Sequence, residues 1–449
     1  MPLAPMQHWF FEQFPDAPLR WNQSVLLASA EPLDAGALRG ALAAVLATHD
    51  ALRARFMRDA ADQAWTQTIV PASGALAEAT FETIDLDEGA AAGDWRVSLA
   101  AHADRLHGSL DLAAGPLLRT ASFATPEGAR LLIVVHHIVV DGVSWRILLD
   151  DLLNAYDALR AGRAPALPKP PTGWRDWSRR LAAYAAQPEW LAELAWWQAR
   201  LGAAEDAAPR AEGGQRHRAW ALDAEATARL IQAGWRIDEV LLAALAHACD
   251  EVLPAVPVVV ELEGHGRGDQ VPDVDLSRTV GWFTTQYPLR VTAHQDVDAT
   301  RRAIGAARAE LPAEGLHYNL LRYAGLAALP ATTVGFNYLG RFEERLGAGR
   351  FTFAAEDSGD GTQGRVAAGA RHWLDLKRPD RRGLPEGGLE RRRWFGRRSD
   401  AGAPGDGIRR AGACARRHGA RRRRRSDARG TATLRRSARG RTGRERGRG

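Results

Sequence analysis

The sequence contains only two cysteines, Cys249 and Cys414, among its 449 residues. Two cysteines cannot form a disulfide framework or a cysteine-rich metal site, and their scarcity is typical of a reducing, cytoplasmic compartment. No run of about eighteen apolar residues is present, so the sequence predicts no transmembrane helix. The N-terminus, MPLAPMQHWF, lacks a basic segment followed by an apolar one, so no signal peptide is expected.

Basic residues are scarce in most of the chain and concentrated at its end. Residues 365–449 hold 28 Lys and Arg against 8 Asp and Glu, a net charge of +20. Because the whole chain carries +6, residues 1–364 carry −14. A chain body with an acidic balance argues against nucleic acid as its partner.

Large apolar side chains are also scarce in residues 365–449, where only ten of 85 residues are of the Ile, Leu, Val, Phe, Met, Trp or Tyr type. So few apolar groups cannot offset the entropy of ordering, and the stretch is predicted to be a disordered basic tail. The basic run Arg421–Arg425 allows a nucleic-acid-binding arm. The composition, rich in Arg, Gly and Ala, favours instead the translation of GC-rich DNA in a shifted reading frame.

The body of the chain reads as alternating strands and helices, which predicts an α/β fold. A Pro-rich stretch, 164–173, predicts a stiff connection between two parts. The expected strands are 24–28, 52–56, 121–123, 131–135, 256–262 and 333–338, and the expected helices are 34–48 with Asp34 as N-cap, 94–108, 145–156, 174–201 and 237–252.

The most informative stretch is LLIVVHHIVVDGVSWRILLDDLLNAY, Leu131–Tyr156. A buried strand ends on His136 and His137, a turn follows with Asp141 and Gly142, and an amphipathic helix begins. Imidazole titrates near neutral pH, so a histidine at a strand end is well placed for proton transfer. On the residues alone the pair is either structural or catalytic. A metal site is the weaker interpretation, because no third ligand lies at a suitable spacing.

A second block, ELEGHGRGDQVPDVDLSRTVGWFTTQYP, follows the strand at 256–262 and places Glu263 beside two glycines. Glycines let the backbone turn sharply and leave the carboxylate exposed, although a plain surface turn would look the same. Further along, Phe336–Gly340 reads FNYLG and includes Asn337 and Tyr338.

These blocks together resemble the epimerization domains of nonribosomal peptide synthetases, a branch of the condensation-domain superfamily. HHIVVDG matches the HHxxxDG signature of the superfamily, whereas GVSWRIL, EGHGR and FNYLG are similar to the epimerization branch. The opening PLAPMQHWFFEQ and the WNQ at 21–23 also match that branch. One motif departs from the family pattern: His317 and Asn319 replace two glycines of its Gly-x-Gly-Tyr-Gly run.

The resemblance implies two chloramphenicol-acetyltransferase-like lobes that form a V, with the HHxxxDG loop facing the cleft. We expect an N-terminal lobe at 1–173, an incomplete C-terminal lobe at 174–364 and the tail at 365–449. The stretch that closes the second lobe in the family is not recognisable here. A truncated remnant without activity is therefore one alternative.

The resemblance also implies the chemistry: epimerization at Cα of an aminoacyl or peptidyl thioester. His137 and Glu263 would be the two proton-handling groups, and Tyr338 and Asn337 would stabilise the oxyanion. Supporting roles fall to His136, Gly142 and Asp141, whose buried partner would be Arg53 or, in second place, Arg55. No metal or bound cofactor is implied, because phosphopantetheine would arrive on a peptidyl carrier protein within a set of synthetase modules. An amide-forming condensation domain is the alternative.

Overall fold

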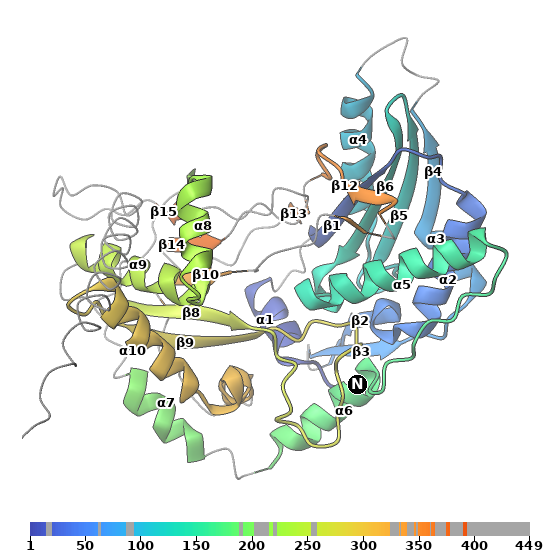
Figure 1. Cartoon of the computed structure of the whole chain (residues 1–449). Coiled ribbons are helices and arrows are strands. Elements are labelled where there is room, and N and C mark those ends of the chain that lie inside the picture. The colour runs from blue at the N-terminus through green and yellow to red at the C-terminus, as the bar shows by residue number, and fades with distance from the viewer. Residues whose placement is uncertain are drawn as a thin grey trace, which may run out of the picture. The chain divides into compact units, whose positions relative to one another are not determined.

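The computed structural model describes residues 1–14, 20–61, 64–86, 94–187, 192–201, 215–218, 222–252, 258–323, 332, 334–338, 345–346, 349–359, 361–363, 374–377 and 389–392. This part of the chain contains helices, two main sheets and a small two-stranded sheet (Figure 1). The predicted α/β class is thus confirmed. No helix among the described residues is long and apolar enough to cross a membrane.

The first sheet is built around the strand that leads to the histidines. Its order is β11-β12-β1-β6-β5-β4, and β13 pairs with β1. The pairs are antiparallel except β4 with β5, and Asn22 lies opposite His136. The bounds are β1 Arg20–Ser29, β4 Phe81–Asp85, β5 Leu118–Thr125, β6 Gly128–His136, β11 Arg345–Leu346, β12 Phe351–Phe353 and β13 Thr362–Gln363.

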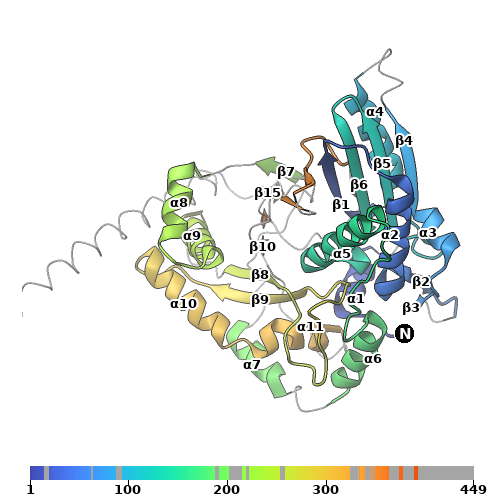
Figure 2. The same cartoon turned by 45° about the vertical axis from the view of Figure 1, so that its right-hand side comes forward.

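Five helices and a hairpin accompany this sheet. The helices α2 and α5 pack side by side, as both views show (Figures 1 and 2). Asp34 accepts a hydrogen bond from the backbone of Ala37, which confirms the predicted N-cap. The bounds are α1 Pro5–Gln13, α2 Ala35–Thr48, α3 Gly74–Thr80, α4 Trp95–His107, α5 Gly142–Arg160, and the hairpin β2 Ala54–Arg58 with β3 Trp65–Ile69.

The apolar run of β6 explains why this sheet is stable. Leu131 to Val135 are at most 3% exposed, as expected for a strand covered on both faces. Leu132 and Val134 join an apolar cluster with Leu99 and Leu106 of α4. The strand therefore ends at a rigid, well-packed position, and it is there that the two histidines follow.

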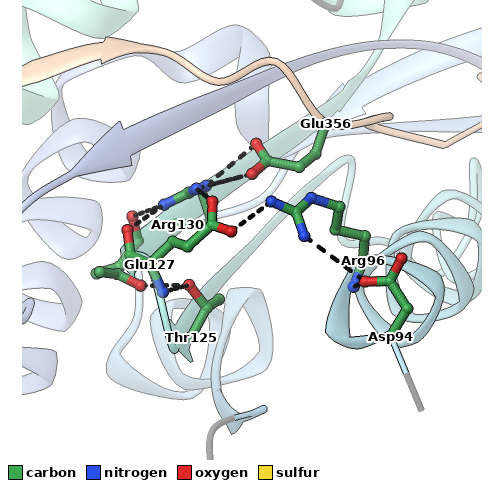
Figure 3. Close-up of polar contacts among 8 residues, drawn as sticks. Asp94, Arg96, Thr125, Glu127, Arg130 and Glu356 are labelled. Atoms are coloured by element: carbon green, nitrogen blue, oxygen red, sulfur yellow. Dashed lines mark hydrogen bonds and ion pairs between the residues drawn. The ribbon is translucent and has the colours of Figure 1, made fainter. Parts of the chain in front are cut away.

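A later segment of the chain pairs with β1 and extends the first sheet at its edge. The backbone of Ala354 donates to Leu26 at 2.9 Å, and Ser24 donates to Ser358 at 3.0 Å. Figure 3 shows Arg130 of β6 between Glu127 and Glu356, and its Nη2 lies 2.7 Å from Glu356 Oε1. Burial alone would raise the pKa of Glu356, but hydrogen bonds from Arg130 lower it overall. Through β12 and β13, residues 351–353 and 362–363 thus extend the first sheet. The lobe boundaries expected from the sequence stay a prediction.

The second sheet has the order β7-β15-β14-β10-β8-β9. Its central strands β8, β10 and β14 are parallel, so their carboxyl ends lie at one edge. Figure 2 shows β8 and β9 running side by side. The bounds are β7 Gln215–Arg218, β8 Val258–Gly264, β9 Thr285–Val291, β10 Val334–Asn337, β14 Leu374–Lys377 and β15 Leu389–Arg392.

Two of these strands lie in the stretch predicted to be a disordered tail. β14 pairs with β10, and β15 pairs with β14 and β7. The remaining residues of 365–449, including the basic run 421–425, lie outside the described residues. Likewise, the predicted strand at 256–262 is described only from Val258.

The chain divides into two compact units. The second unit comprises the described residues 222–252 and 291–306 and contains α8 Ala224–Gln232, α9 Ile237–Val252 and most of α10 Val297–Ala309. Inside it, His247 Nε2 lies 3.0 Å from Thr300 Oγ1. The first unit holds both sheets and also α6 Trp174–Ala185, α7 Glu193–Leu201, η4 Pro312–Gly315 and α11 Leu316–Tyr323. The single helix predicted at 174–201 is thus two helices, α6 and α7.

Candidate functional site

The histidine pair lies where β6 meets the helix α5. His136 is the last residue of β6, and His137 begins the 3-10 turn η2, His137–Val139. Asp141 then caps α5, because its Oδ1 accepts from the backbone of Ser144 at 2.7 Å. The local sequence therefore produces a strand, a tight turn and a capped helix within a few residues.

The two histidines have different surroundings. His136 is 2% exposed and its ring packs against Phe10. Its Nδ1 accepts a hydrogen bond from the backbone of Ile138 at 3.2 Å, while its buried Nε2 has no hydrogen-bond partner. Burial lowers the pKa of His136 to about 3, so this ring is neutral near pH 7 and serves the packing.

His137 is partly buried between aromatic rings. The Trp282 ring centre lies 4.3 Å away, and Trp21 stacks at 6.3 Å. Its Nδ1 lies 2.8 Å from the carbonyl oxygen of Val140, and its Nε2 lies 3.0 Å from Gln23 Nε2. Burial lowers the pKa of His137, although the Val140 carbonyl and the charge of Asp141 act in the opposite direction. The ring is thus available as a base at neutral pH.

The partner of Asp141 is Arg267, which corrects the prediction of Arg53. Arg267 Nη2 lies 3.1 Å from Asp141 Oδ1, and both side chains are at most 6% exposed. The backbone of Phe283 donates to Asp141 Oδ2 at 3.0 Å. Every oxygen of this carboxylate is therefore occupied by structural contacts.

Arg53 lies elsewhere because it belongs to the 3-10 turn η1, Asp50–Arg53, rather than to a strand. Its guanidinium donates to the backbone oxygens of Leu46 and Val70. Arg55 donates to the oxygen of Ala54 at 2.8 Å. Both arginines thus satisfy carbonyl groups at the ends of neighbouring elements.

Arg267 is held rigidly. Its Nη1 donates to the backbone oxygens of Leu276 and Thr279, at 2.8 and 2.6 Å. The guanidinium carbon lies 4.1 Å from the centre of the Phe283 ring. Gly266 makes this approach possible, because it has a φ of 62° and an added Cβ would lie 1.7 Å from the oxygen of Phe283.

Glu263 and Asn337 are brought together by the parallel strands β8 and β10. Asn337 Nδ2 donates to Glu263 Oε2 at 2.7 Å. Glu263 is exposed, and Tyr338, which follows Asn337, is partly buried. Three residues predicted from the sequence thus lie at the carboxyl ends of adjacent strands.

The buried ion pair connects the turn that begins at His137 with the loop that follows Glu263 at the end of β8. Asp141 lies four residues after His137, and Arg267 lies four residues after Glu263. Gly142, in contrast, needs no special backbone, because an added Cβ there would meet no atom within 4 Å. Among the described residues, no three His, Cys, Asp or Glu side chains gather as metal ligands would.

The family model of the condensation domain matches residues 1–326. The chain belongs to the condensation-domain family. One of the linear gramicidin synthase proteins of Brevibacillus parabrevis is 38% identical over 78% of this chain, and surfactin synthase subunit 2 of Bacillus subtilis is 33% identical over 82%. The chain spans only 7% and 10% of these two relatives, so it corresponds to a small part of each.

Solved structures show the same family fold. The epimerization domain from the third module of tyrocidine synthetase B has a TM-score of 0.77 at 29% identity, over 92% of this chain and 95% of that one. The first condensation domain of the calcium-dependent antibiotic synthetase has a TM-score of 0.63 at 22% identity, over 92% and 95%. The second likeness concerns the fold alone.

Three residues that contact this condensation-family site were not predicted to be part of it: Gln23, Trp145 and Trp282. Gln23 lies in WNQ and Trp145 in GVSWRIL, two motifs that are similar to the epimerization branch, and Trp282 lies in the block that follows Glu263. The sequence therefore marked these residues as parts of recognisable blocks. What the sequence could not show is that Gln23 and Trp282, from distant segments, contact one imidazole and that Trp145 bonds to Gln23.

Proposed function

We propose that this chain epimerizes the Cα of an aminoacyl or peptidyl thioester held on a carrier protein's phosphopantetheine arm. The observation that carries the proposal is the second candidate proton-handling group: Glu263 lies near the end of β8, and Arg267, in the loop that follows, pairs with Asp141 after the histidines. Epimerization needs two such groups, because one takes the Cα proton and the other returns a proton to the opposite face. The solved epimerization domain at 29% identity supports the same choice.

The residues fit the steps of this reaction. The thioester acidifies the Cα–H bond, and His137, neutral through burial, takes the proton at Nε2. The electron pair moves into the thioester carbonyl and forms an enolate. Asn337 and Tyr338 would donate hydrogen bonds to its oxygen. Glu263, exposed and held by Asn337 at 2.7 Å, would take a proton from water and deliver it to the other face of Cα, and His137 would then return its proton to water.

No resident cofactor takes part in this proposal. The phosphopantetheine belongs to the carrier protein, which would be the direct partner, and neighbouring synthetase modules would supply the substrate. The multimodular relatives support such partners, because this chain covers only a small share of each.

Amide-bond formation is the second candidate, favoured by the condensation-domain family model itself. In that reaction His137 would position or deprotonate an amine that attacks the thioester. Glu263 separates the candidates, since a condensing site needs no proton donor opposite the histidine.

Glu263→Gln tests the proposal. We expect the variant to lose racemisation of a carrier-bound aminoacyl thioester by about 100-fold or more, because the donor of one face is removed. Binding of the loaded carrier protein should be unchanged. Chiral analysis of the released amino acid measures the first, and a pull-down with the carrier measures the second.

Glu314→Gln is the matched control, because Glu314 is also an exposed glutamate. Its carboxylate lies 3.7 Å from His265, a residue of the same loop as Arg267. The Glu314→Gln variant should equilibrate L and D forms normally. If Glu263→Gln does so too, Glu263 is a turn residue. Condensing activity that survives in that variant would then favour the second candidate.

A further inference from the structure

A short chain of hydrogen bonds runs from Trp145 through Gln23 and the imidazole of His137 to the carbonyl oxygen of Val140. Trp145 Nε1, in the first turn of α5, donates to Gln23 Oε1 at 2.7 Å. Gln23, on β1, places its Nε2 3.0 Å from His137 Nε2. His137 Nδ1 completes the chain at the Val140 oxygen, 2.8 Å away.

The direction of every hydrogen bond in this chain follows from its first member. An indole nitrogen can only donate, so the Gln23 atom that faces Trp145 must be the amide oxygen. The other end of the amide is then NH₂, which can also only donate. His137 Nε2 must therefore be the acceptor and carry a lone pair, and the ring proton lies on Nδ1, where the Val140 carbonyl accepts it.

The opposite arrangement is disfavoured by the same geometry. If His137 were protonated at both nitrogens, Gln23 would have to turn its oxygen toward Nε2. The amide NH₂ would then face the indole donor of Trp145, which is 1% exposed and would be left buried without an acceptor. The orientation of one amide thus follows the protonation of the histidine.

We propose that Gln23 and Trp145 are positioning residues that hold His137 as the neutral tautomer with its lone pair on Nε2. Gln23 contacts the base and Trp145 fixes the orientation of Gln23, and together they make the imidazolium form less stable. The incoming Cα–H would displace the amide of Gln23 and meet the lone pair already oriented. The proposal extends the proposed function, since it concerns the base of that reaction.

The charged groups around His137 do not by themselves fix its protonation state. Asp141 favours the imidazolium, but its carboxylate is already paired with Arg267. His136, on β6, is neutral near pH 7. The residues of β1 and of the 281–283 segment that face the ring, Trp21 and Trp282, carry no charge. Burial lowers the pKa of His137, which agrees with a neutral ring.

The direct test is nuclear magnetic resonance of the full chain with ¹⁵N-labelled histidine, in which His137 is assigned by the signal lost in His137→Ala. Near pH 7 we expect a protonated Nδ1 and an unprotonated Nε2. A ring with the proton on Nε2, or an imidazolium, would overturn the proposal. This measurement needs no substrate, so it stands or fails independently of epimerase activity.

Two variants test the control by the amide. In Gln23→Glu, a carboxylate can accept from Trp145 and from a protonated His137, so the pKa of His137 should rise by about one unit or more. In Trp145→Phe the amide can turn freely, and the pKa should rise by roughly half a unit. The acid limb of the pH profile of kcat/KM should move upward by the same amounts.

Gln187→Glu adds the same charge at an exposed position after α6 and should leave the histidine signal unchanged. If Gln23→Glu fails to fold, Trp145→Phe and the wild-type tautomer still decide the question. An unchanged His137 titration in folded Gln23→Glu or in Trp145→Phe would show that these residues only fill space.

Discussion

Two adjacent histidines illustrate how burial separates chemical roles at the scale of the residue. His136 is neutral near pH 7, packed on Phe10, and its Nδ1 accepts from the backbone. His137 contacts Gln23 through its Nε2 and lies between two indole rings. The pattern HHxxxDG predicts a special pair, and the partly buried second member is the one that we propose as the base.

Replacing His137 by Ala should abolish exchange of the Cα proton, because no other described base lies on the η2 turn. Wash-out of deuterium from a carrier-bound aminoacyl thioester measures this exchange. The variant should keep a normal thermal transition, since the His137 side chain hydrogen-bonds only with the side chain of Gln23 and the carbonyl of Val140 among the described residues. Exchange at the wild-type rate would contradict the assignment.

Asp141→Ala provides the contrast at the same loop. Its carboxylate pairs with Arg267, caps α5 and accepts from Phe283. We expect this variant chiefly to lose stability. Thermal unfolding and solubility are therefore the measurements, with His137→Ala as the companion variant.

At the scale of the element, sequence patterns predicted what is local. The Asp34 cap, the buried run of β6 and the helix after Asp141 all depend on neighbours within a few residues. The partner of Asp141 does not, because Arg267 lies far away in the chain and Arg53 has the same chemistry. Only the path of the loop through Gly266 selects between the two.

The Arg267–Asp141 pair gives a prediction for these elements. Arg267→Met should lower the free energy of unfolding by about 3–5 kcal/mol, because a buried carboxylate loses its counter-charge. Arg105→Met, which breaks an exposed pair with Glu82, should cost about 0–1 kcal/mol. Urea unfolding of both variants measures the difference. Equal losses of unfolding free energy in the two variants would show that the buried pair contributes no more to stability than the exposed pair.

At the scale of the whole molecule, the sequence predicted the family and the order of motifs but not the path of the C-terminal strands. β12 has three residues and β13 has two, too few for a recognisable alternation. β14 and β15 lie in a stretch whose composition predicted no order. Their pairing with β10 and β7 depends on neighbours that are distant in the sequence.

Truncation tests where the fold ends. A chain cut after Arg397 keeps β14 and β15 and should unfold like the full chain. A chain cut after residue 364 leaves one edge of β10 unpaired and should unfold at a lower temperature and associate. A protease-resistant fragment that extends well past Arg398 would contradict this limit.

The shifted-frame hypothesis is tested separately, by reading the DNA around codon 360 in three frames.

The closure of the first sheet by residues 351–363 has a consequence for recombination. A crossover between related synthetase genes at residue 173 would take β1 and β6 from one parent and β12 from the other. The contacts Arg130–Glu356, Ser24–Ser358 and Leu26–Ala354 would then join unmatched halves. Hybrids that inherit 1–397 as one block should retain folding, because this block keeps β12 with β1 and also keeps β14 and β15 with β10.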